Sequence, residues 1–413
     1  MYENTVTVIG MGHLGLPLAV TFAMSGFKVY AVDIDENKIK ILKNHKSPIS
    51  ETGLSEAISD PEISKNLIPT TDIEVAIKSS LASFILVNTP SNPDGSYGLK
   101  FLLNVAENIG KILKIINNYH TVVEVSTVSP GDCLKYVVPM LEKKSGKKCG
   151  MDFGFVHNPE FIALGSVITD MLHPDFRIIG EYDKNSGDIV ERIYKKVSSD
   201  PILRMGINNA ELVKIALNCY LTIKISFANT LGEICDKMDG GNVDLVTKAL
   251  GMDKRISPKF LKAGLGYGGP CFPRDDKALI SLARNLGAQA YLSEASSKVN
   301  NRQVSLAVNK IKSIPNIKNI TILGVSYKPN VPYVIDSQAF EIAKILSEDK
   351  TYTVTLYDPQ AMSEARKFLK YGVNYAENIE EAISVESDLI LVLTPWKEFK
   401  NIDFKDRKVM TFW

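Results

Sequence analysis

The chain has 413 residues and a mass of 45.6 kDa, a length that predicts two or three domains. Its 48 Lys and Arg residues and 47 Asp and Glu residues leave a net charge of +1, which argues against charge-driven binding to nucleic acid or a membrane surface. The five cysteines lack the spacing of a metal knuckle, a redox pair or a disulfide framework. We therefore expect no metal site and a reducing, cytoplasmic compartment.

The first apolar stretch covers residues 6–24 and resembles a secretory signal or a membrane span in length. Glycines at 10, 12 and 15, a histidine at 13 and a proline at 17 interrupt it. We expect neither a signal nor a membrane span.

Short β-branched runs alternate with helical patterns in the first 200 residues. The runs at 5–9, 28–33, 84–88 and 121–126 predict strands, and the patterns at 16–25 and 102–116 predict helices. This alternation is typical of a parallel sheet covered on both faces by helices.

A proline-free pattern at residues 208–238 predicts one long helix in the middle of the chain. We expect its buried face to carry the apolar residues that recur three or four positions apart, namely Leu212, Ile215, Cys219, Ile223, Phe227 and Leu231. About 30 residues of helix extend for about 45 Å, enough to connect two domains and to offer a dimer face.

A second, smaller α/β unit is predicted at residues 315–413, where strand signals recur at 319–325, 353–357 and 387–394. The expected fold is α/β, with two Rossmann-like parallel-sheet domains joined by a long central helix and a small helical domain. The expected boundaries are 1–200, 201–312 and 313–413. Ligands of such sheets bind beyond the carboxyl ends of the strands, in a cleft that we expect between the two units.

The first strand is followed by the pattern G-x-G-x-x-G, formed by Gly10, Gly12 and Gly15 with His13 and Leu14 between them. This pattern between a strand and a helix predicts a pyrophosphate site at the helix N-terminus. Asp33 ends the second strand, where a carboxylate accepts both ribose hydroxyls and repels a 2′-phosphate. The sequence therefore favours NAD over NADP.

Residues 264–275 contain Gly264, Gly266, Gly268 and Gly269, too many glycines for a helix or a strand. Such a backbone curls around a ligand and presents N–H groups to it. Most lone cysteines are small buried apolar residues, an assignment that we give to Cys133, Cys149, Cys219 and Cys235. The glycine loop, with Arg274 and Asp275 nearby, favours a nucleophile at Cys271.

Lys214 and Asn218 lie four residues apart on the predicted long helix and so share one face. A cation and an amide donor together stabilise the alkoxide that forms when a thiolate attacks a carbonyl. A lysine and an asparagine on a helix usually form a solvated face, but this helix is apolar over most of its circumference. We therefore predict an oxyanion site here.

Six segments together resemble the UDP-glucose/GDP-mannose dehydrogenase family over nearly the whole chain. They are residues 10–15, 126–128, 158–161, 210–214 with Asn218, 264–275 and 324–330. The family consists of NAD-dependent enzymes that oxidise the primary alcohol of a nucleotide sugar to a carboxylate. The resemblance is greatest to UDP-glucose 6-dehydrogenases.

The resemblance implies a four-electron reaction in which Cys271 adds to an aldehyde and a thioester is then hydrolysed by water. Lys214 and Asn218 would hold the C6 oxygen, and Asp275 would assist proton transfer through water. Thr127 would place a hydroxyl near that water, and Glu160 would be the base for hydrolysis. The resemblance also implies a homodimer in which Arg255 reaches the sugar of the partner.

Further binding residues are implied by the same resemblance. Cofactor contacts are expected at Gly10, Gly12, His13, Leu14, Gly15, Asp33, Thr89 and Thr127. Substrate contacts are expected at Glu160, Phe161, Ile162, Lys214, Asn218, Arg255, Phe260, Gly264, Gly268 and Lys328.

Three features depart from the family pattern. Leu164 replaces a second glutamate, Tyr333 and Ile335 replace an Asp and an Arg of the segment after Lys328, and Gly98 replaces an aspartate. The first two departures affect water activation and a cofactor contact. The sequence therefore leaves three hypotheses: oxidation of UDP-glucose, the same chemistry on GDP-mannose or a UDP-N-acetylhexosamine, and an impaired nucleotide-sugar-binding protein.

Overall fold

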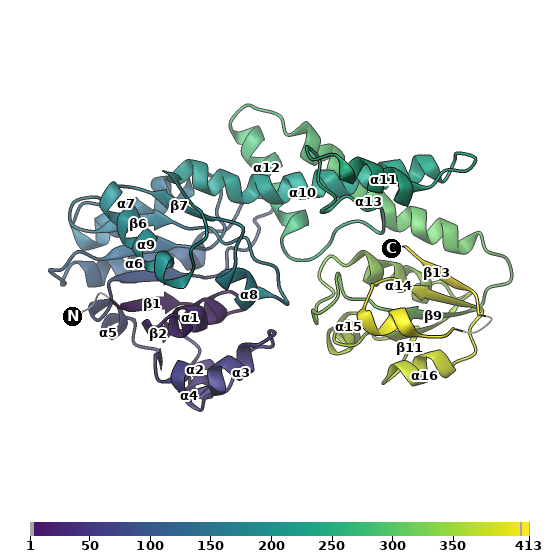
Figure 1. Ribbon diagram of the computed structural model, residues 1–413, viewed down its shortest axis with the longest axis horizontal. Coiled ribbons are helices and arrows are strands. Elements are labelled where there is room, and N and C mark those ends of the chain that lie inside the picture. Colours follow the sequence, from purple (N-terminus) through teal and green to yellow (C-terminus); the bar gives the residue numbers. More distant parts are fainter. Residues whose placement is uncertain (1–3, 405–406, 413) are drawn as a thin grey trace. The chain divides into compact units, whose positions relative to one another are not determined.

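A computed structural model describes residues 4–404 and 407–412. The chain divides into two compact units between Ile215 and Ala216 (Figure 1). Each unit is described by itself.

The first unit is built on a sheet with the strand order β3-β2-β1-β4-β5-β6-β7-β8. Neighbouring strands are parallel except β6 and β7, which are antiparallel and correct the expectation of a wholly parallel sheet. The strands are β1 (Thr5–Ile9), β2 (Lys28–Val32), β3 (Leu67–Thr70), β4 (Ala82–Ile85), β5 (Thr121–Glu124), β6 (Gly154–His157), β7 (Arg177–Glu181) and β8 (Ile202–Gly206).

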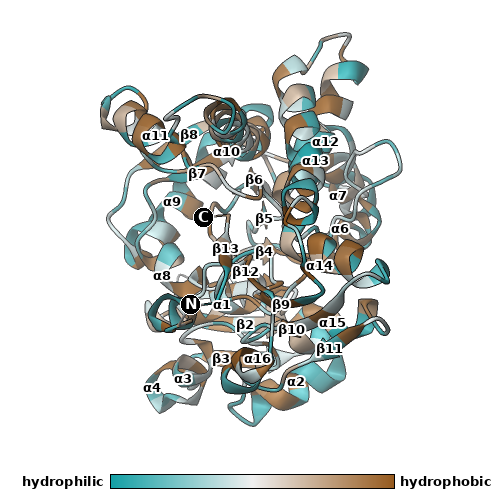
Figure 2. Ribbon diagram, turned by 90° about the vertical axis from the view of Figure 1, so that its right-hand side faces the viewer, coloured by the Kyte–Doolittle hydropathy of each residue, from teal (hydrophilic) through white to brown (hydrophobic). Residues whose placement is uncertain are grey.

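Helices connect these strands, and hydrophobic and hydrophilic residues alternate along many of them (Figure 2). The helices are α1 (Gly15–Met24), α2 (Glu36–Lys43), α3 (Leu54–Ser59), α4 (Pro61–Ser64), α5 (Ile73–Lys78), α6 (Lys100–Leu113), the π-helix η1 (Cys133–Val137), α7 (Val138–Ser145), α8 (Val167–Leu172) and α9 (Lys184–Val197).

The sheet has an apolar layer on each face because successive strand side chains point to opposite sides. Phe84 belongs to one cluster of buried residues and Ile85 to the other. Every residue of α1 except Met24 is buried, as expected for a helix that is apolar on all sides. Phe22 of this helix packs against Phe84, with ring centroids 4.8 Å apart.

The second unit has a five-stranded parallel sheet with the order β11-β10-β9-β12-β13. Its strands are β9 (Asn319–Leu323), β10 (Thr353–Tyr357), β11 (Val373–Tyr375), β12 (Leu389–Val392) and β13 (Val409–Thr411). Its helices are α11 (Val243–Met252), α12 (Phe272–Asn285), α13 (Tyr291–Lys312), α14 (Gln338–Glu348), α15 (Met362–Phe368), α16 (Ile379–Ser384) and the 3-10 helix η2 (Lys397–Asn401). The two sheets and the long helix confirm the expected fold class.

The long helix, α10 (Ile207–Cys235), is confirmed, but its predicted buried face is wrong in part. Ile215 and Cys219 are buried, whereas Leu212 and Phe227 are exposed. The reason is that polar side chains with partners in the second unit occupy the inward face. Those buried polar residues are Asn218, Thr222, Ser226 and Asn229.

Among the described residues, no helix combines the length and apolar character that crossing a membrane requires.

Candidate active site

The turn between β1 and α1 requires glycine at two positions. Gly10 has φ = +100°, and a Cβ there would lie 2.1 Å from the carbonyl oxygen of Leu86. A Cβ at Gly15 would lie 1.8 Å from the carbonyl oxygen of Gly10. Nothing lies within 4 Å of a Cβ built on Gly12, so the backbone there is open to a ligand. This arrangement fits the pyrophosphate of a dinucleotide.

Asp33 directly follows β2 and faces this turn. Its Oδ2 accepts a hydrogen bond of 2.7 Å from the backbone N–H of Met11 and one of 3.3 Å from Lys38 Nζ. Its Oδ1 accepts a hydrogen bond of 2.9 Å from the N–H of Asp35. The carboxylate is therefore fixed at the end of β2, where a ribose of the cofactor is expected.

His13 and Leu14 lie in the same turn. Burial lowers the pKa of His13, while Glu51 opposes the shift and Lys38 adds to it. Leu14 precedes α1 and packs against the apolar core.

Thr89 and Thr127 are joined by a hydrogen bond of 2.7 Å from Thr89 Oγ1 to the carbonyl oxygen of Thr127. The segments after β4 and β5 are also linked through Ser126 Oγ, which accepts a hydrogen bond of 3.0 Å from the N–H of Val87. The structure thus brings together two of the residues expected to contact the cofactor.

The segment after β6 is fixed at successive residues. Asn158 donates a hydrogen bond of 2.8 Å from Nδ2 to the carbonyl oxygen of Ile178, and its Oδ1 accepts one from the hydroxyl of Tyr194. Glu160 is buried, with Oε1 3.7 Å from Nη1 of Arg177. Burial raises the pKa of Glu160, and the charges of Arg177 and Lys214 oppose this shift.

Lys214 contacts the same segment from α10. Its Nζ donates a hydrogen bond of 2.6 Å to the backbone carbonyl oxygen of Glu160 and lies 5.2 Å from the centre of the Phe161 ring. Phe161 also packs against Phe176, and Ile162 packs against the core of the first unit. Lys214 is half-buried, as the apolar character of the helix predicts. The structure therefore brings Lys214 to Glu160.

Cys271 lies directly before α12 in the second unit and is exposed, whereas the other four cysteines are buried. Asp275, in the first turn of α12, accepts a hydrogen bond of 2.6 Å from Nδ2 of Asn218. Arg274 Nε lies 3.5 Å from Oδ1 of the same carboxylate. The second unit thus brings Asn218 of α10 to the first turn of the helix that directly follows Cys271.

The glycine loop before Cys271 packs closely on its surroundings. A Cβ at Gly268 would lie 2.2 Å from the carbonyl oxygen of Asp336, and a Cβ at Gly269 would lie 2.5 Å from the ring of Tyr327. Gly264 N–H donates a hydrogen bond of 2.7 Å to Oδ1 of Asn229. Close packing against the Asp336 backbone and the Tyr327 ring therefore explains why glycine stands at positions 268 and 269.

Three other expected substrate residues have different surroundings. Arg255 is exposed and forms an ion pair of 2.6 Å with Asp253 of its own chain. Phe260 is exposed, with its ring 6.3 Å from that of Phe272. The Nζ of Lys328 lies 6.0 Å from the centre of the Tyr327 ring.

The departures from the family pattern also have local explanations. Leu164 packs against the apolar core of the first unit. The Ile335 side chain is exposed, and its backbone carbonyl accepts a hydrogen bond of 3.0 Å from Gly269 N–H. A Cβ at Gly98 would lie 2.9 Å from the carbonyl oxygen of Pro90, so this turn favours glycine over the usual aspartate. The backbone carbonyl of Tyr333 accepts a hydrogen bond of 3.2 Å from the N–H of Tyr327.

Sequence reasoning missed several residues that hold this site. Arg177 and Tyr194 contact Glu160 from β7 and α9, and no local motif marks either one. Glu211 accepts hydrogen bonds from the N–H groups of Gly131 and Cys133, shortly after Thr127. Glu211 lies within the segment 210–214 that carries the family resemblance, and this segment was its signal in the sequence.

Asn300 and Asp276 were also missed. The side chain of Asn300 bonds both the N–H and the carbonyl of Tyr267, at 2.8 and 3.0 Å, and so clamps the glycine loop. Tyr267 in turn donates a hydrogen bond of 2.6 Å from its hydroxyl to Oδ2 of Asp276. Burial raises the pKa of Asp276, and the hydroxyls of Tyr267 and Thr222 oppose the shift.

Comparison with known families covers both sheets and the helical middle. Residues 4–198 match the NAD binding domain of the UDP-glucose/GDP-mannose dehydrogenase family, 208–302 its central domain and 321–411 its UDP binding domain. The chain belongs to the UDP-glucose/GDP-mannose dehydrogenase family.

Members of the UDP-glucose/GDP-mannose dehydrogenase family from several organisms resemble the chain over most of its length. UDP-glucose 6-dehydrogenase TuaD of Bacillus subtilis is 35% identical over 408 residues, which cover 98% of this chain and 86% of that protein. GDP-mannose 6-dehydrogenase of Pseudomonas syringae is 34% identical over 356 residues, which cover 86% of this chain and 80% of that protein.

A solved structure of a UDP-glucose dehydrogenase from Pyrobaculum islandicum has a TM-score of 0.92 and 32% identity, covering 99% of this chain and 94% of that one. This UDP-glucose/GDP-mannose dehydrogenase is therefore a nucleotide-sugar 6-dehydrogenase with NAD as its cofactor. The turn at Gly12 and the carboxylate of Asp33 fit that cofactor.

Proposed function

We propose that the enzyme oxidises the C6 hydroxymethyl group of UDP-glucose to the carboxylate of UDP-glucuronate through a thioester on Cys271. The exposure of Cys271 at the start of α12, next to the Asn218–Asp275 pair, carries this proposal. Each sugar consumes two NAD⁺ and one water and yields one carboxylate, two NADH and three protons. The names of relatives such as TuaD support UDP-glucose as the substrate.

The residues of the chain have separate roles in this scheme. NAD⁺, when bound, accepts a hydride in each of the two oxidations. Lys214 and Asn218 donate hydrogen bonds to the C6 oxygen as negative charge develops on it. Asp275 assists proton transfer through a water that Thr127 also contacts, and Cys271 Sγ forms a bond to the aldehyde carbon. Glu160 takes a proton from the water that hydrolyses the thioester.

The three family segments suggest a division of this work along the chain. In our proposal, residues 1–200 bind the cofactor, residues 201–312 supply the Cys271 loop and the dimer contacts, and residues 313–413 bind the nucleotide. Gly10, Gly12, His13, Leu14, Gly15, Asp33, Thr89 and Thr127 form the proposed cofactor site. Phe161, Ile162, Phe260, Gly264, Gly268 and Lys328 join the named catalytic residues in the proposed substrate site.

A homodimer is part of the same proposal. Tyr220, Phe227 and Ile234 recur every seven residues on α10 and therefore form one stripe, and all three are exposed. A stripe of large exposed apolar side chains marks a protein interface. Arg255 would reach the sugar of the partner in this dimer. Sedimentation as a monomer at the assay concentration would contradict the dimer.

The central experiment mixes the protein with NAD⁺ and one nucleotide sugar and follows NADH absorbance. We expect two NADH per UDP-glucose, and no acid from Cys271→Ala although this variant still binds UDP-glucose. Undiminished acid formation by Cys271→Ala would contradict the thioester.

GDP-mannose is the second candidate substrate, because a GDP-mannose 6-dehydrogenase is 34% identical to the chain. A UDP-N-acetylhexosamine is tested in the same assay. Two NADH per sugar with one of these, and none with UDP-glucose, would reassign the substrate. Binding without any NADH would identify an impaired enzyme that retains nucleotide-sugar binding.

A further inference from the structure

Arg177 is the first residue of β7 and lies buried beside Glu160, with 4% of its side chain exposed. Nη1 is 3.7 Å from Oε1 of Glu160, which is longer than a hydrogen bond. Nη2 donates a hydrogen bond to the backbone carbonyl of Met171, and Nε has no hydrogen-bond partner among the described residues. The guanidinium therefore acts on Glu160 through its charge and not through a hydrogen bond.

Tyr194 on α9 lies against both groups. Its ring centre is 4.3 Å from Cζ of Arg177, a cation–π contact that helps to keep the buried guanidinium in place. Its hydroxyl lies 2.5 Å from Oδ1 of Asn158 and 3.4 Å from Oε1 of Glu160. The single hydroxyl proton goes to the nearer acceptor, so Tyr194 contributes little to the Glu160 carboxylate.

The charged and titratable groups that face Glu160 are Arg177 from β7, Tyr194 from α9 and Lys214 from α10. Burial raises the pKa of Glu160, and Arg177 is the largest of the opposing influences. Lys214 directs its ammonium group to the backbone carbonyl of Glu160, at 2.6 Å. Arg177 is thus the cation placed on the carboxylate itself.

We propose that Arg177 is a positioning residue for thioester hydrolysis, whose charge keeps the Glu160 carboxyl ionised so that it can accept a proton. This inference rests on the proposed function, in which Glu160 is the base. In that step the water oxygen bonds to the acyl carbon, and Glu160 takes a proton from the water. The C–S bond breaks, and its electron pair leaves with the sulfur of Cys271.

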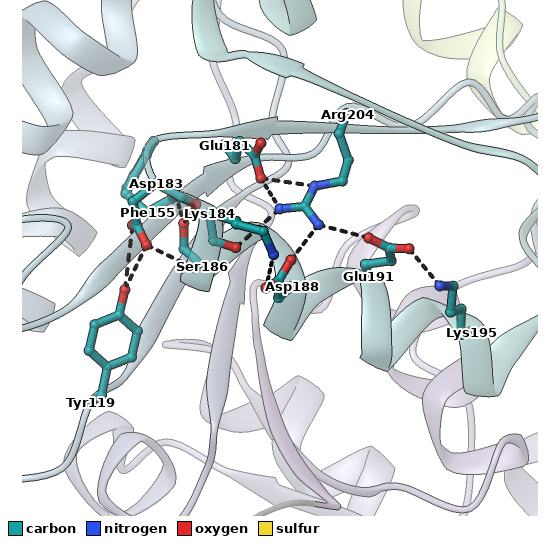
Figure 3. Close-up of polar contacts among 10 residues, drawn as sticks. All are labelled: Tyr119, Phe155, Glu181, Asp183, Lys184, Ser186, Asp188, Glu191, Lys195 and Arg204. Carbon is teal, nitrogen blue, oxygen red and sulfur yellow. Dashed lines mark hydrogen bonds and ion pairs between the residues drawn. The ribbon is translucent and has the colours of Figure 1, made fainter.

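A second arginine, on the strand that pairs with β7, provides a matched control. Arg204 on β8 hydrogen-bonds Glu181 of β7, and it also bonds Asp188 and Glu191 of α9 at 2.5 and 2.9 Å (Figure 3). This network ties together the two elements that carry Arg177 and Tyr194, yet Glu160 takes no part in it. Arg204→Met therefore loosens the same packing without removing the charge beside Glu160.

The test follows hydrolysis separately from oxidation in the full enzyme with UDP-glucose and NAD⁺. Rapid-quench samples between pH 5 and 9 give the rate of acid formation, and mass spectrometry gives the amount of acyl group on Cys271. Losing an opposite charge at this distance raises a carboxyl pKa by about one to three units. For Arg177→Met we expect the acid-side limb of the pH–rate profile of hydrolysis to move to higher pH by about one to three units. We also expect acyl-enzyme to accumulate at pH 7.

Three further variants make the outcome decisive. We expect Arg177→Lys to restore most of the wild-type limb, and Tyr194→Phe and Arg204→Met to leave the limb within about half a pH unit of its wild-type position. An unchanged limb in Arg177→Met overturns the inference, as does an equal shift in Arg204→Met. If Arg177→Met does not fold, Arg177→Gln decides instead, because glutamine keeps a donor for the Met171 carbonyl but carries no charge. The limb of Arg177→Gln must then shift as expected for Arg177→Met, and an unchanged limb overturns the inference. A wild-type enzyme that forms no acyl group on Cys271 would instead overturn the proposed function.

Discussion

Asp33 and Asp358 occupy the same position in the two sheets, directly after the second strand of each βαβ arrangement. Asp33 accepts a hydrogen bond of 2.7 Å from Met11 N–H, and Asp358 accepts one of 2.8 Å from Val325 N–H. In both turns the preceding glycine has positive φ and donates to the end of the second strand at 2.7 Å. The same type of turn therefore occurs in both units.

The two carboxylates nevertheless differ in how far the chain itself satisfies them. Asp358 is buried, and its two oxygens accept hydrogen bonds from the backbone N–H groups of Val325, Ser326, Gln360 and Ala361 and from the side chains of Ser326 and Trp396. Such a carboxylate has no capacity left for a ribose. The carboxylate of this turn can thus bind a ribose in the first unit, whereas in the second unit it holds the surrounding loops in place.

Asp33→Asn is expected to weaken cofactor binding. The substitution removes the charge that favours ribose hydroxyls and repels a 2′-phosphate, and a charge-assisted hydrogen bond contributes about 1.5–3 kcal/mol. We expect the KM for NAD⁺ to rise about ten- to a hundredfold and the preference over NADP⁺ to narrow. Steady-state kinetics with both cofactors measures the two effects.

Asp358→Asn is the matched control for that prediction. It should lower the stability of the second unit, because buried N–H groups lose their acceptor, but leave the KM for NAD⁺ within about twofold of the wild-type value. An equal rise of KM in both variants would show that Asp33 acts through the stability of the fold alone.

Lys214→Ala is expected to lower kcat about a hundred- to a thousandfold with little change in KM for the sugar, because the charge it meets develops in the transition state. Lys224→Ala is the control, since Lys224 is another lysine of α10 whose Nζ donates to backbone carbonyls, those of Ile256 and Ser257, both at 3.1 Å. Its kcat should stay near that of the wild type. A change confined to KM in Lys214→Ala would disprove the oxyanion role.

Much of the fold could be predicted because local patterns and the fold agree. The strands at residues 5–9 and 353–357 were predicted to the residue, since β-branched runs bounded by turn residues mark buried strands. The exposed face of α10 could not be predicted. Apolar periodicity locates a helix face, but it does not say whether the chain itself or another surface covers Phe227.

The candidate site divides in the same way. The turn at Gly10 and the loop at Gly268 could be predicted from the sequence, because only glycine fits where backbones approach this closely. The contact of Arg177 with Glu160 could not be predicted, because it depends on how β7 pairs with β6 and where α9 packs. Side chains that tune a catalytic group from a distant part of the sequence leave no local pattern.

His120 gives a stability prediction that is independent of catalysis. It is fully buried before β5, with Nε2 2.9 Å from Ser83 Oγ and Nδ1 3.1 Å from the carbonyl oxygen of Ser80. Burial lowers the pKa of His120 to about 4, against 6.5 for an ordinary histidine. Above pH 6.5 both the folded and the unfolded chain keep this ring neutral. As pH falls below 6.5, His120 binds a proton in the unfolded chain, whereas in the folded chain it stays neutral until about pH 4.

The contribution of His120 to the free energy of unfolding is therefore complete above pH 6.5 and falls by about 3 kcal/mol as pH drops to 4. His120→Gln should show a shallower decline than the wild type over this range in urea unfolding. Buried carboxyls with a raised pKa, such as Glu124, act in the opposite sense, but they are present in both proteins and cancel in the comparison. Equal slopes in the two proteins would mean that His120 already carries a proton in the folded chain.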